Sequence, residues 1–69
     1  MARFIKIKSI NQGIYIDMIL NIDDIGHISI GPNMIFMKTR FADNSNYICV
    51  TSETIEKLEK VLDVKEVID

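Results

Sequence analysis

The sequence predicts an α+β domain that is mainly β: a small antiparallel curled sheet or SH3-like barrel of about five strands, with one C-terminal helix. Apolar residues recur mostly at every second position before Thr51 and at every third or fourth position after it, which are the periods of a strand and of a helix. Turn-forming residues interrupt the first part at 11–13, 31–33 and 42–46. With 69 residues, the chain is expected to form one domain spanning 1–69.

The first predicted hairpin lies near the N-terminus. Side chains alternate between apolar and polar along residues 4–10, and the many β-branched residues suit a half-buried strand. Asn11-Gln12-Gly13 supplies residues that tolerate a positive φ and predicts a three-residue hairpin turn, and a second strand follows at 14–16. Two interpretations remain for residues 17–21: a single helical turn capped by Asp17, which we favour, or a bend in the strand.

Three more strands are predicted, separated by turn residues. They lie at 22–30, 34–40 and 47–50. Gly26, in the middle of the first of these strands, indicates a bulge or a close approach of another backbone. Proline in the 31–33 turn presets φ and cannot donate to a β-ladder, so the chain is expected to reverse there. The polar loop at 42–46 makes the last two strands a second hairpin.

One amphipathic helix is predicted after the fifth strand. Thr51 or Ser52 can cap it, because a hydroxyl oxygen accepts a hydrogen bond from a free amide of the first turn. The predicted buried stripe consists of Ile55, Leu58, Val61 and Leu62. We expect the helix to end near Asp63, and residues 64–68 to form either a frayed continuation or a short extended tail.

Length and composition together predict self-association. A chain of 69 residues has marginal stability by itself, and disulfides, a structural metal or oligomerisation are the usual aids. One cysteine and one histidine argue against the first two. The 48% hydrophobic content is more than so small an interior can hide. We therefore expect a homo-oligomer, whose interface is exposed sheet surface or the apolar residues of the tail, Val64, Val67 and Ile68.

Charge and hydropathy indicate which partners and which cellular location to expect. A formal net charge of -2 argues against a protein built mainly to neutralise nucleic-acid phosphates. No apolar run is long enough to cross a bilayer, and polar residues interrupt residues 1–20, so neither membrane insertion nor a secretory signal peptide is expected. A single free thiol fits a reducing compartment. The expected location is the cytoplasm.

A period-two row of basic residues is the best indication of ligand binding. The candidate binding residues are Lys6, Lys8, Lys38 and Arg40 on the first and fourth predicted strands, with Tyr15 and Tyr47 as aromatic groups that could stack on bases. A basic sheet face that carries aromatic side chains is how several proteins bind single-stranded nucleic acid. Lysines on the outer face of an antiparallel sheet are ordinary, so a solvated face is the leading interpretation and a binding site the alternative.

No residue pattern predicts catalysis, a metal or a cofactor. Residues 21–26 look superficially like a calcium loop, but Ile25 occupies a ligand position and the twelfth position is Pro32. His27 has no nucleophile at a suitable spacing. Cys49 lies between two apolar residues and is expected to be a buried thiol that packs as a small hydrophobic group. We therefore expect a protein that is not an enzyme and that uses no cofactor.

Several segments match a known pattern: Ile5-Lys6-Ile7-Lys8, Asn11-Gln12-Gly13, Tyr15-Ile16-Asp17, Ile22 and Ile25, Ile35-Phe36-Met37, and Tyr47-Ile48-Cys49-Val50 leading into Thr51-Ser52. Together they resemble the small flagellar and swarming-motility (FlbD-like) protein family and similar short uncharacterised bacterial and phage proteins. They extend over nearly the whole chain. The resemblance implies a non-enzymatic accessory protein with no catalytic residues.

These observations lead to one functional hypothesis and one alternative. The leading hypothesis is a small non-catalytic interaction module that self-associates and binds a protein partner. The alternative is a small protein that binds a ligand or a single-stranded nucleic acid through its basic sheet face or through an oligomer interface.

Overall fold

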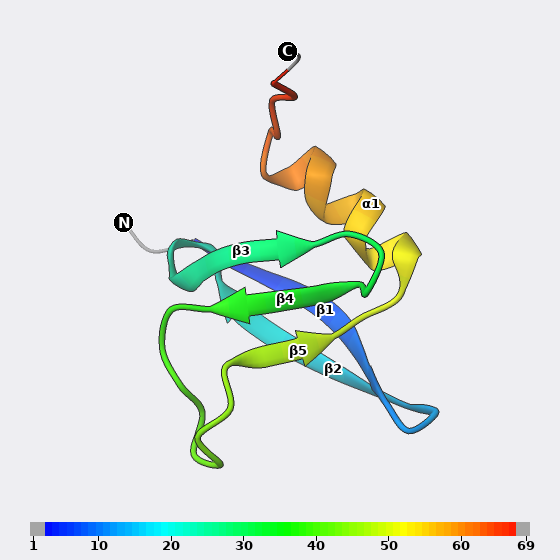
Figure 1. Cartoon of the computed structure of the whole chain (residues 1–69), viewed down its shortest axis with the longest axis vertical. Helices are drawn as coiled ribbons and strands as arrows, with labels where there is room; N and C mark the ends of the chain where they lie inside the picture. The colour runs from blue at the N-terminus through cyan, green and yellow to red at the C-terminus, as the bar shows by residue number, and fades with distance from the viewer. Residues whose placement is uncertain (1–2, 68–69) are drawn as a thin grey trace.

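Seven secondary-structure elements follow one another in a computed structural model that describes residues 3–67 (Figure 1). They are β1 (Phe4–Asn11), β2 (Ile14–Asn21), the short 3-10 helix η1 (Ile22–Asp24), β3 (Ile25–Ser29), β4 (Met34–Met37), β5 (Tyr47–Cys49) and α1 (Ser52–Val61). All strand pairs are antiparallel. The predicted class, mainly β with five strands and a C-terminal helix, is confirmed.

β1 and β2 form a long regular hairpin. Their register runs without a shift from Phe4 opposite Asn21 to Asn11 opposite Ile14. The turn has two residues, Gln12 and Gly13, and not the predicted three, because Asn11 still pairs with Ile14. The φ values of Gln12 and Gly13 are 50° and 80°, and two positive φ values are what a hairpin turn of the primed type requires. Gly13 adopts this conformation at no steric cost.

The helical turn expected at residues 17–21 is wrong, because these residues continue β2. Each residue of 17–20 pairs with a residue of β1, so the ladder hydrogen bonds outweigh the local capping preference of Asp17. A helical turn does form, but only after β2 has ended, at η1. Asn21 caps it by accepting a hydrogen bond from the Asp23 amide at 3.1 Å. The extended segment predicted for 22–30 therefore begins only at Ile25.

The second sheet contains β3, β4 and β5 in that order. Its register shifts between Ile25 and His27, as the position of Gly26 predicted. A Cβ atom on Gly26 would lie 3.2 Å from the carbonyl oxygen of Phe36, so the close backbone approach is also confirmed. β4 ends at Met37 and not at the predicted residue 40: the Lys38 amide still donates to the carbonyl of Asp24, just before β3, and the chain bends at residues 38–39.

The two sheets are connected but do not close. Ser9 of β1 forms an isolated antiparallel bridge with Val50, just after β5. Figure 1 shows the hairpin crossing behind the three-stranded sheet, with its turn extending beyond β5. Of the two predicted forms, the structure is an open, curled arrangement of two small sheets and not a closed barrel. β2 and β3 consequently lie at the outer edges of their sheets.

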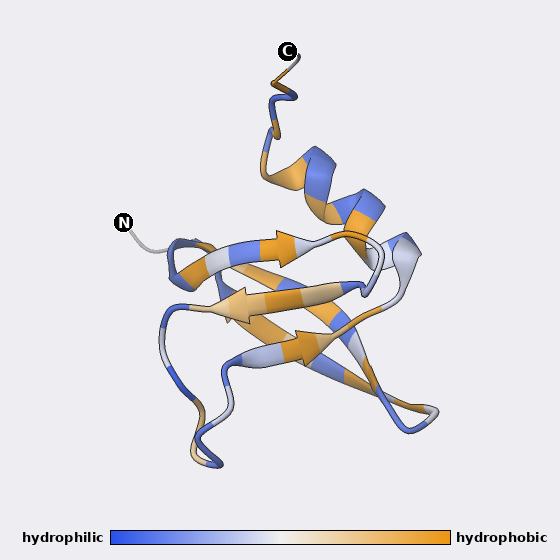
Figure 2. Ribbon diagram, viewed as in Figure 1, coloured by the Kyte–Doolittle hydropathy of each residue, from blue (hydrophilic) through white to orange (hydrophobic). Residues whose placement is uncertain are grey.

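The hydrophobic core lies between the two sheets and α1. Its buried side chains are Ile7, Leu20, Ile35, Met37, Ile48, Val50, Ile55 and Leu58. Figure 2 shows hydrophobic positions alternating with hydrophilic ones along β1. On α1, the hydrophobic positions lie on the side that faces the sheets. Ile35 of the central strand β4 has no exposed surface at all, which marks the centre of this core.

The helix begins where the sequence predicted, and Thr51 is its cap. The Thr51 hydroxyl oxygen accepts a hydrogen bond from the Thr54 amide at 3.3 Å. Leu58 is buried and Leu62 is partly buried, but Val61 is 53% exposed, so the prediction that Val61 belongs to the buried stripe is wrong. At 3.6 residues per turn, Val61 lies about 60° around the helix from Leu58, so it borders the β1–β2 hairpin at the margin of the packed face and is not enclosed by it.

Candidate binding surfaces

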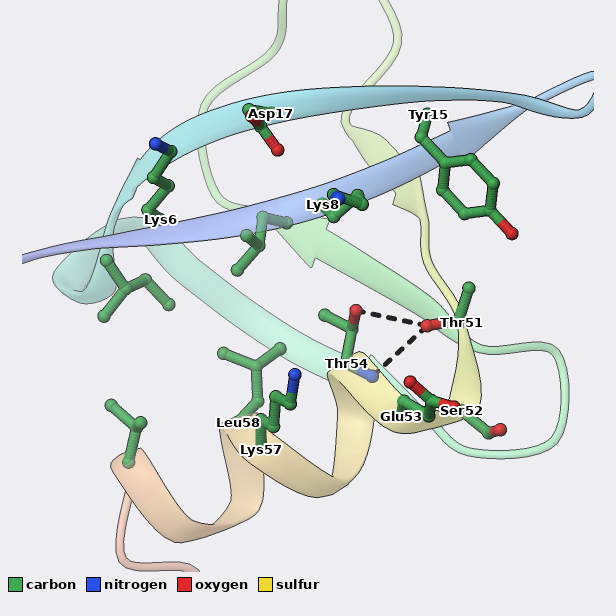
Figure 3. A pocket seen from close by; sticks show the side chains of 13 residues that line it. Lys6, Lys8, Tyr15, Asp17, Thr51, Ser52, Glu53, Thr54, Lys57 and Leu58 are labelled. Atoms are coloured by element: carbon green, nitrogen blue, oxygen red, sulfur yellow. Dashed lines mark hydrogen bonds between the residues drawn. The ribbon is translucent and has the colours of Figure 1, made fainter.

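A groove of about 680 Å³ lies between the β1–β2 hairpin and the first turns of α1. Its charged and aromatic lining residues are Lys6, Lys8, Tyr15, Asp17, Glu53 and Lys57. Figure 3 shows the side chains of Lys57 and Leu58 rising from the helix towards the hairpin. The groove thus combines residues from the first 17 positions of the chain with residues from the C-terminal helix.

The alternation along β1 explains the hairpin side of this groove. Ile7 is buried in the core, so Lys6 and Lys8 on either side of it are exposed on the opposite face. Lys8 is directly opposite Asp17 in the hairpin register, and directly opposite residues share a face. Tyr15 belongs to the same face and is 57% exposed.

The helical side of the groove is organised by the Thr51 cap. Thr51 and Thr54 are joined by the amide-to-hydroxyl bond and by a hydroxyl contact of 3.2 Å, both visible in Figure 3. Lys57 follows on the exposed side of the helix. Among the described residues, no carboxylate lies within 4.0 Å of the ammonium group of Lys6, Lys8 or Lys57. Three lysines against Asp17 and Glu53 make the lining slightly positive, which suits an acidic partner segment.

The predicted basic row does not form one surface. Lys6, Lys8 and Tyr15 meet in the groove, whereas Lys38 and Arg40 follow β4 in the other sheet. The Arg40 guanidinium donates a hydrogen bond to the carbonyl of Asn44 at 2.9 Å, within its own loop. The sequence period is the same on both strands, but it does not reveal that the strands belong to different sheets.

The second sheet carries a row of three rings that the sequence analysis did not identify. His27 stacks on Phe36 with ring centroids 4.4 Å apart and an interplanar angle of 13°. Tyr47 follows on the other side of Phe36 at 6.4 Å. The rings come from β3, β4 and β5, and the register places each opposite the next. Only the strand pairing could have shown this row, because the three residues are far apart in the sequence.

Two further sequence predictions concern the thiol and the tail. Cys49 is exposed, so the prediction of a buried thiol is wrong: buried Ile48 and Val50 flank it, and alternation turns the residue between them outward.

Val64 and Val67 are 56% and 88% exposed, and Ile68 lies outside the described residues. The structure therefore places these two valines on the surface without indicating what covers them.

The outer edge of β2 is the most apolar exposed part of the fold. Five large hydrophobic side chains of the hairpin are between 49% and 70% exposed, namely Phe4, Ile14, Tyr15, Ile16 and Ile19. Four of them belong to β2. Within residues 3–67, β2 pairs with β1 on one side, and no other segment forms a backbone hydrogen bond with it.

Among the described residues there is neither a candidate metal site nor a helix that could cross a membrane. They contain no group of three or more His, Cys, Asp or Glu side chains placed to hold a metal ion. None of the helices in residues 3–67 is both long and apolar enough to cross a membrane. Comparisons with protein-family models, with curated proteins and with solved structures found no match to this chain. The function must therefore be inferred from the surfaces of the chain itself.

Proposed function

We propose that the protein is a small non-catalytic interaction module that self-associates and binds a protein partner in the cytoplasm. The observation that carries this proposal is the edge strand β2, which has eight residues and four large exposed hydrophobic side chains. Long apolar edge strands are templates for pairing with another chain, and proteins that stay monomeric block them with charges, proline or bulges. The exposed thiol of Cys49 suits a reducing compartment. The resemblance to FlbD-like proteins supports the same accessory role.

Light scattering at micromolar concentration tests the self-association. We expect about twice the chain mass of 7.9 kDa. Ile14→Lys on β2 should shift the protein to monomer, because a lysine on an edge strand opposes pairing. Ile30→Lys is the matched control, since Ile14 and Ile30 are 64% and 70% exposed and Ile30 lies outside β2. A wild-type mass equal to the monomer at every concentration would contradict the proposal.

The predicted tail interface is tested in the same assay. Val64→Glu combined with Val67→Glu places two charges on the exposed tail. If the tail valines hold the oligomer together, this variant becomes monomeric while Ile14→Lys keeps the wild-type mass. We expect the opposite result, because the edge of β2 also offers backbone hydrogen-bonding groups.

The groove between the hairpin and α1 is our candidate site for the protein partner. Its three lysines have no ion-pair partner within 4.0 Å among the described residues, so they are available to carboxylates. An NMR titration with a hexaglutamate peptide should shift the amide signals of Lys8 and Lys57, and a hexalysine peptide should not. Equal shifts with both peptides, or none with hexaglutamate, would exclude an acidic partner segment in this groove.

The ring row on the second sheet supports a second candidate function, binding of single-stranded nucleic acid. His27, Phe36 and Tyr47 form a stacking surface, and Lys38 comes directly after β4. Fluorescence anisotropy with a labelled oligothymidine at about 50 and 200 mM salt tests it, because phosphate contacts weaken steeply as salt rises. Tyr47→Ala should reduce affinity by roughly 5- to 150-fold, and Tyr15→Ala on the hairpin should not. Affinity that is independent of salt and of Tyr47 would exclude this function.

A further inference from the structure

We propose that two copies of the chain pair antiparallel along β2, about a twofold axis beside Ile16, and so form one four-stranded sheet from two hairpins. This inference rests on the self-association proposed above and specifies its geometry. An antiparallel strand is its own complement under a twofold axis, because each copy presents the same edge to the other. The pairing would occupy the far edge of β2, which has no backbone partner among the described residues, whereas the far edge of β1 is bridged to Val50 at Ser9.

The two sheet edges differ in their suitability for pairing. β2 has eight residues in an unbroken register with β1. β3 has five residues, and its register shifts between Ile25 and His27. Bulges and short length are devices that protect an edge strand from pairing. The edge of β2 therefore accepts a second strand, and the edge of β3 does not.

The composition of β2 also favours pairing with a copy of itself. Asp17 is its one charged residue, and the strand contains no lysine, arginine or proline, which are the residues that commonly block an edge. Lys8 is directly opposite Asp17 on the neighbouring strand of the same hairpin, although their charged groups are not within 4.0 Å of each other. A second β2 strand would thus meet an apolar strand with a single carboxylate.

The position of Asp17 limits the register of the pair. In a continuous antiparallel sheet with a twofold axis, the residue at the axis is directly opposite its own copy. An axis at Asp17 would place two carboxylates directly opposite each other, and like charges in this position are destabilising. The axis must therefore lie beside a neighbouring position on the other face, Ile16 or Met18.

The side chain at the axis favours Ile16 over Met18, because Ile16 is 49% exposed and Met18 is half-buried. With the axis at Ile16, the two Ile16 side chains are opposite each other, Ile14 is opposite the partner's Met18, and Tyr15 is opposite the partner's Asp17. This register covers Ile14, Tyr15 and Ile16, which are 64%, 57% and 49% exposed in the single chain, and leaves Ile19, which is 70% exposed, opposite the partner's turn residue Gly13. An axis at Met18 would cover Ile19, but it would leave Ile14 beyond the paired region and would centre the interface on a side chain that is already half-buried.

Disulfide trapping tests this register. All variants carry Cys49→Ser, because the natural thiol is exposed and would form disulfides of its own. Directly opposite residues have Cβ atoms about 4.5–5.5 Å apart, close to the separation that a disulfide spans. Under mild oxidation with copper phenanthroline, Ile16→Cys should form a covalent dimer at least about tenfold faster than Ile14→Cys. In the proposed register the two copies of residue 14 are offset by four positions, about 13 Å.

A second variant keeps the test valid if Ile16→Cys fails to fold. The double variant Ile14→Cys with Met18→Cys should form two disulfides between subunits, because residue 14 of each copy is opposite residue 18 of the other. Circular dichroism identifies which variants are folded. A dimer by light scattering with no preference for Ile16→Cys, or with faster trapping of a single Met18→Cys, overturns this register. A Cys49→Ser protein that is monomeric at every concentration overturns self-association itself, and this register with it.

Discussion

Ser9 of β1 and Val50 form the antiparallel bridge that connects the hairpin to the three-stranded sheet. Both residues are buried, with exposed fractions of 7% and 4%. The Ser9 hydroxyl donates a hydrogen bond to the carbonyl of Ile16 at 3.1 Å, so the junction is also attached to β2. A buried hydroxyl with a partner is tolerated in a core, and this one joins β1 to β2 at the residue that also bridges to Val50.

Ser9→Ala should destabilise the protein by about 1 kcal/mol. The substitution removes one hydrogen bond of the hydroxyl without leaving an unpaired donor, and a typical intramolecular hydrogen bond contributes about that much. Urea denaturation followed by circular dichroism measures the change. Ser52→Ala, at an exposed position, is the control and should change stability by less than about 0.5 kcal/mol. Equal effects of the two variants would mean that the junction is not a stabilising contact.

Leu58→Ala should cost about 2–5 kcal/mol, as removal of a large core side chain does. Leu58 is 3% exposed and belongs to the main core cluster. The matched substitution Val61→Ala, three residues further along the same helix, should cost much less because Val61 is 53% exposed. Denaturation curves in which the two variants are equally destabilised would show that the helix packs through a different face.

Thr51→Ala should destabilise the protein by about 1 kcal/mol, because it removes the acceptor for the Thr54 amide at the start of α1. Thr51→Ser retains the hydroxyl and should stay close to the wild type. The two variants are compared by thermal unfolding. If both lose the same stability, the methyl group of Thr51, and not its capping hydroxyl, is the important part.

The loop after β4 provides a pH-dependent prediction. The side-chain hydrogen bond from Ser45, followed by the bond from the Ser45 amide, lowers the pKa of Asp43 below its ordinary value of 3.8. Both bonds favour the charged carboxylate, so their contribution is present above the unfolded pKa and is lost as the pH falls through the folded pKa. In an NMR titration of the side-chain carboxyl, Ser45→Ala should raise the pKa of Asp43. An unchanged titration would show that these bonds do not form in solution.

Local sequence patterns were sufficient where short-range physics decides the structure. The alternation of residues 4–10, the position of the turn at Gly13 and the cap at Thr51 depend on neighbours only a few positions away, and all three are as predicted. Gly26 belongs to the same group, since a glycine within a strand pattern commonly marks a bulge. The prediction of the helical turn was wrong because Asp17 pairs with Lys8, nine positions earlier.

The candidate surfaces were only partly predictable for the same reason. Lys6, Lys8 and Tyr15 lie together because one hairpin holds them, whereas Lys38 and Arg40 follow β4 and Tyr47 belongs to β5, in another part of the fold. The ring row of His27, Phe36 and Tyr47 depends on the pairing of three strands.

The sequence by itself determined the class of fold, the place where strands give way to the helix, and the surplus of apolar residues. These properties follow from side-chain period and composition, which need no knowledge of partners in space. Only the tertiary structure decided that the sheets remain open and that the surplus is concentrated on one edge strand, β2. The physical reason is that pairing between distant strands determines which side of each strand is covered, and a period-two pattern is the same for a central strand and an edge strand.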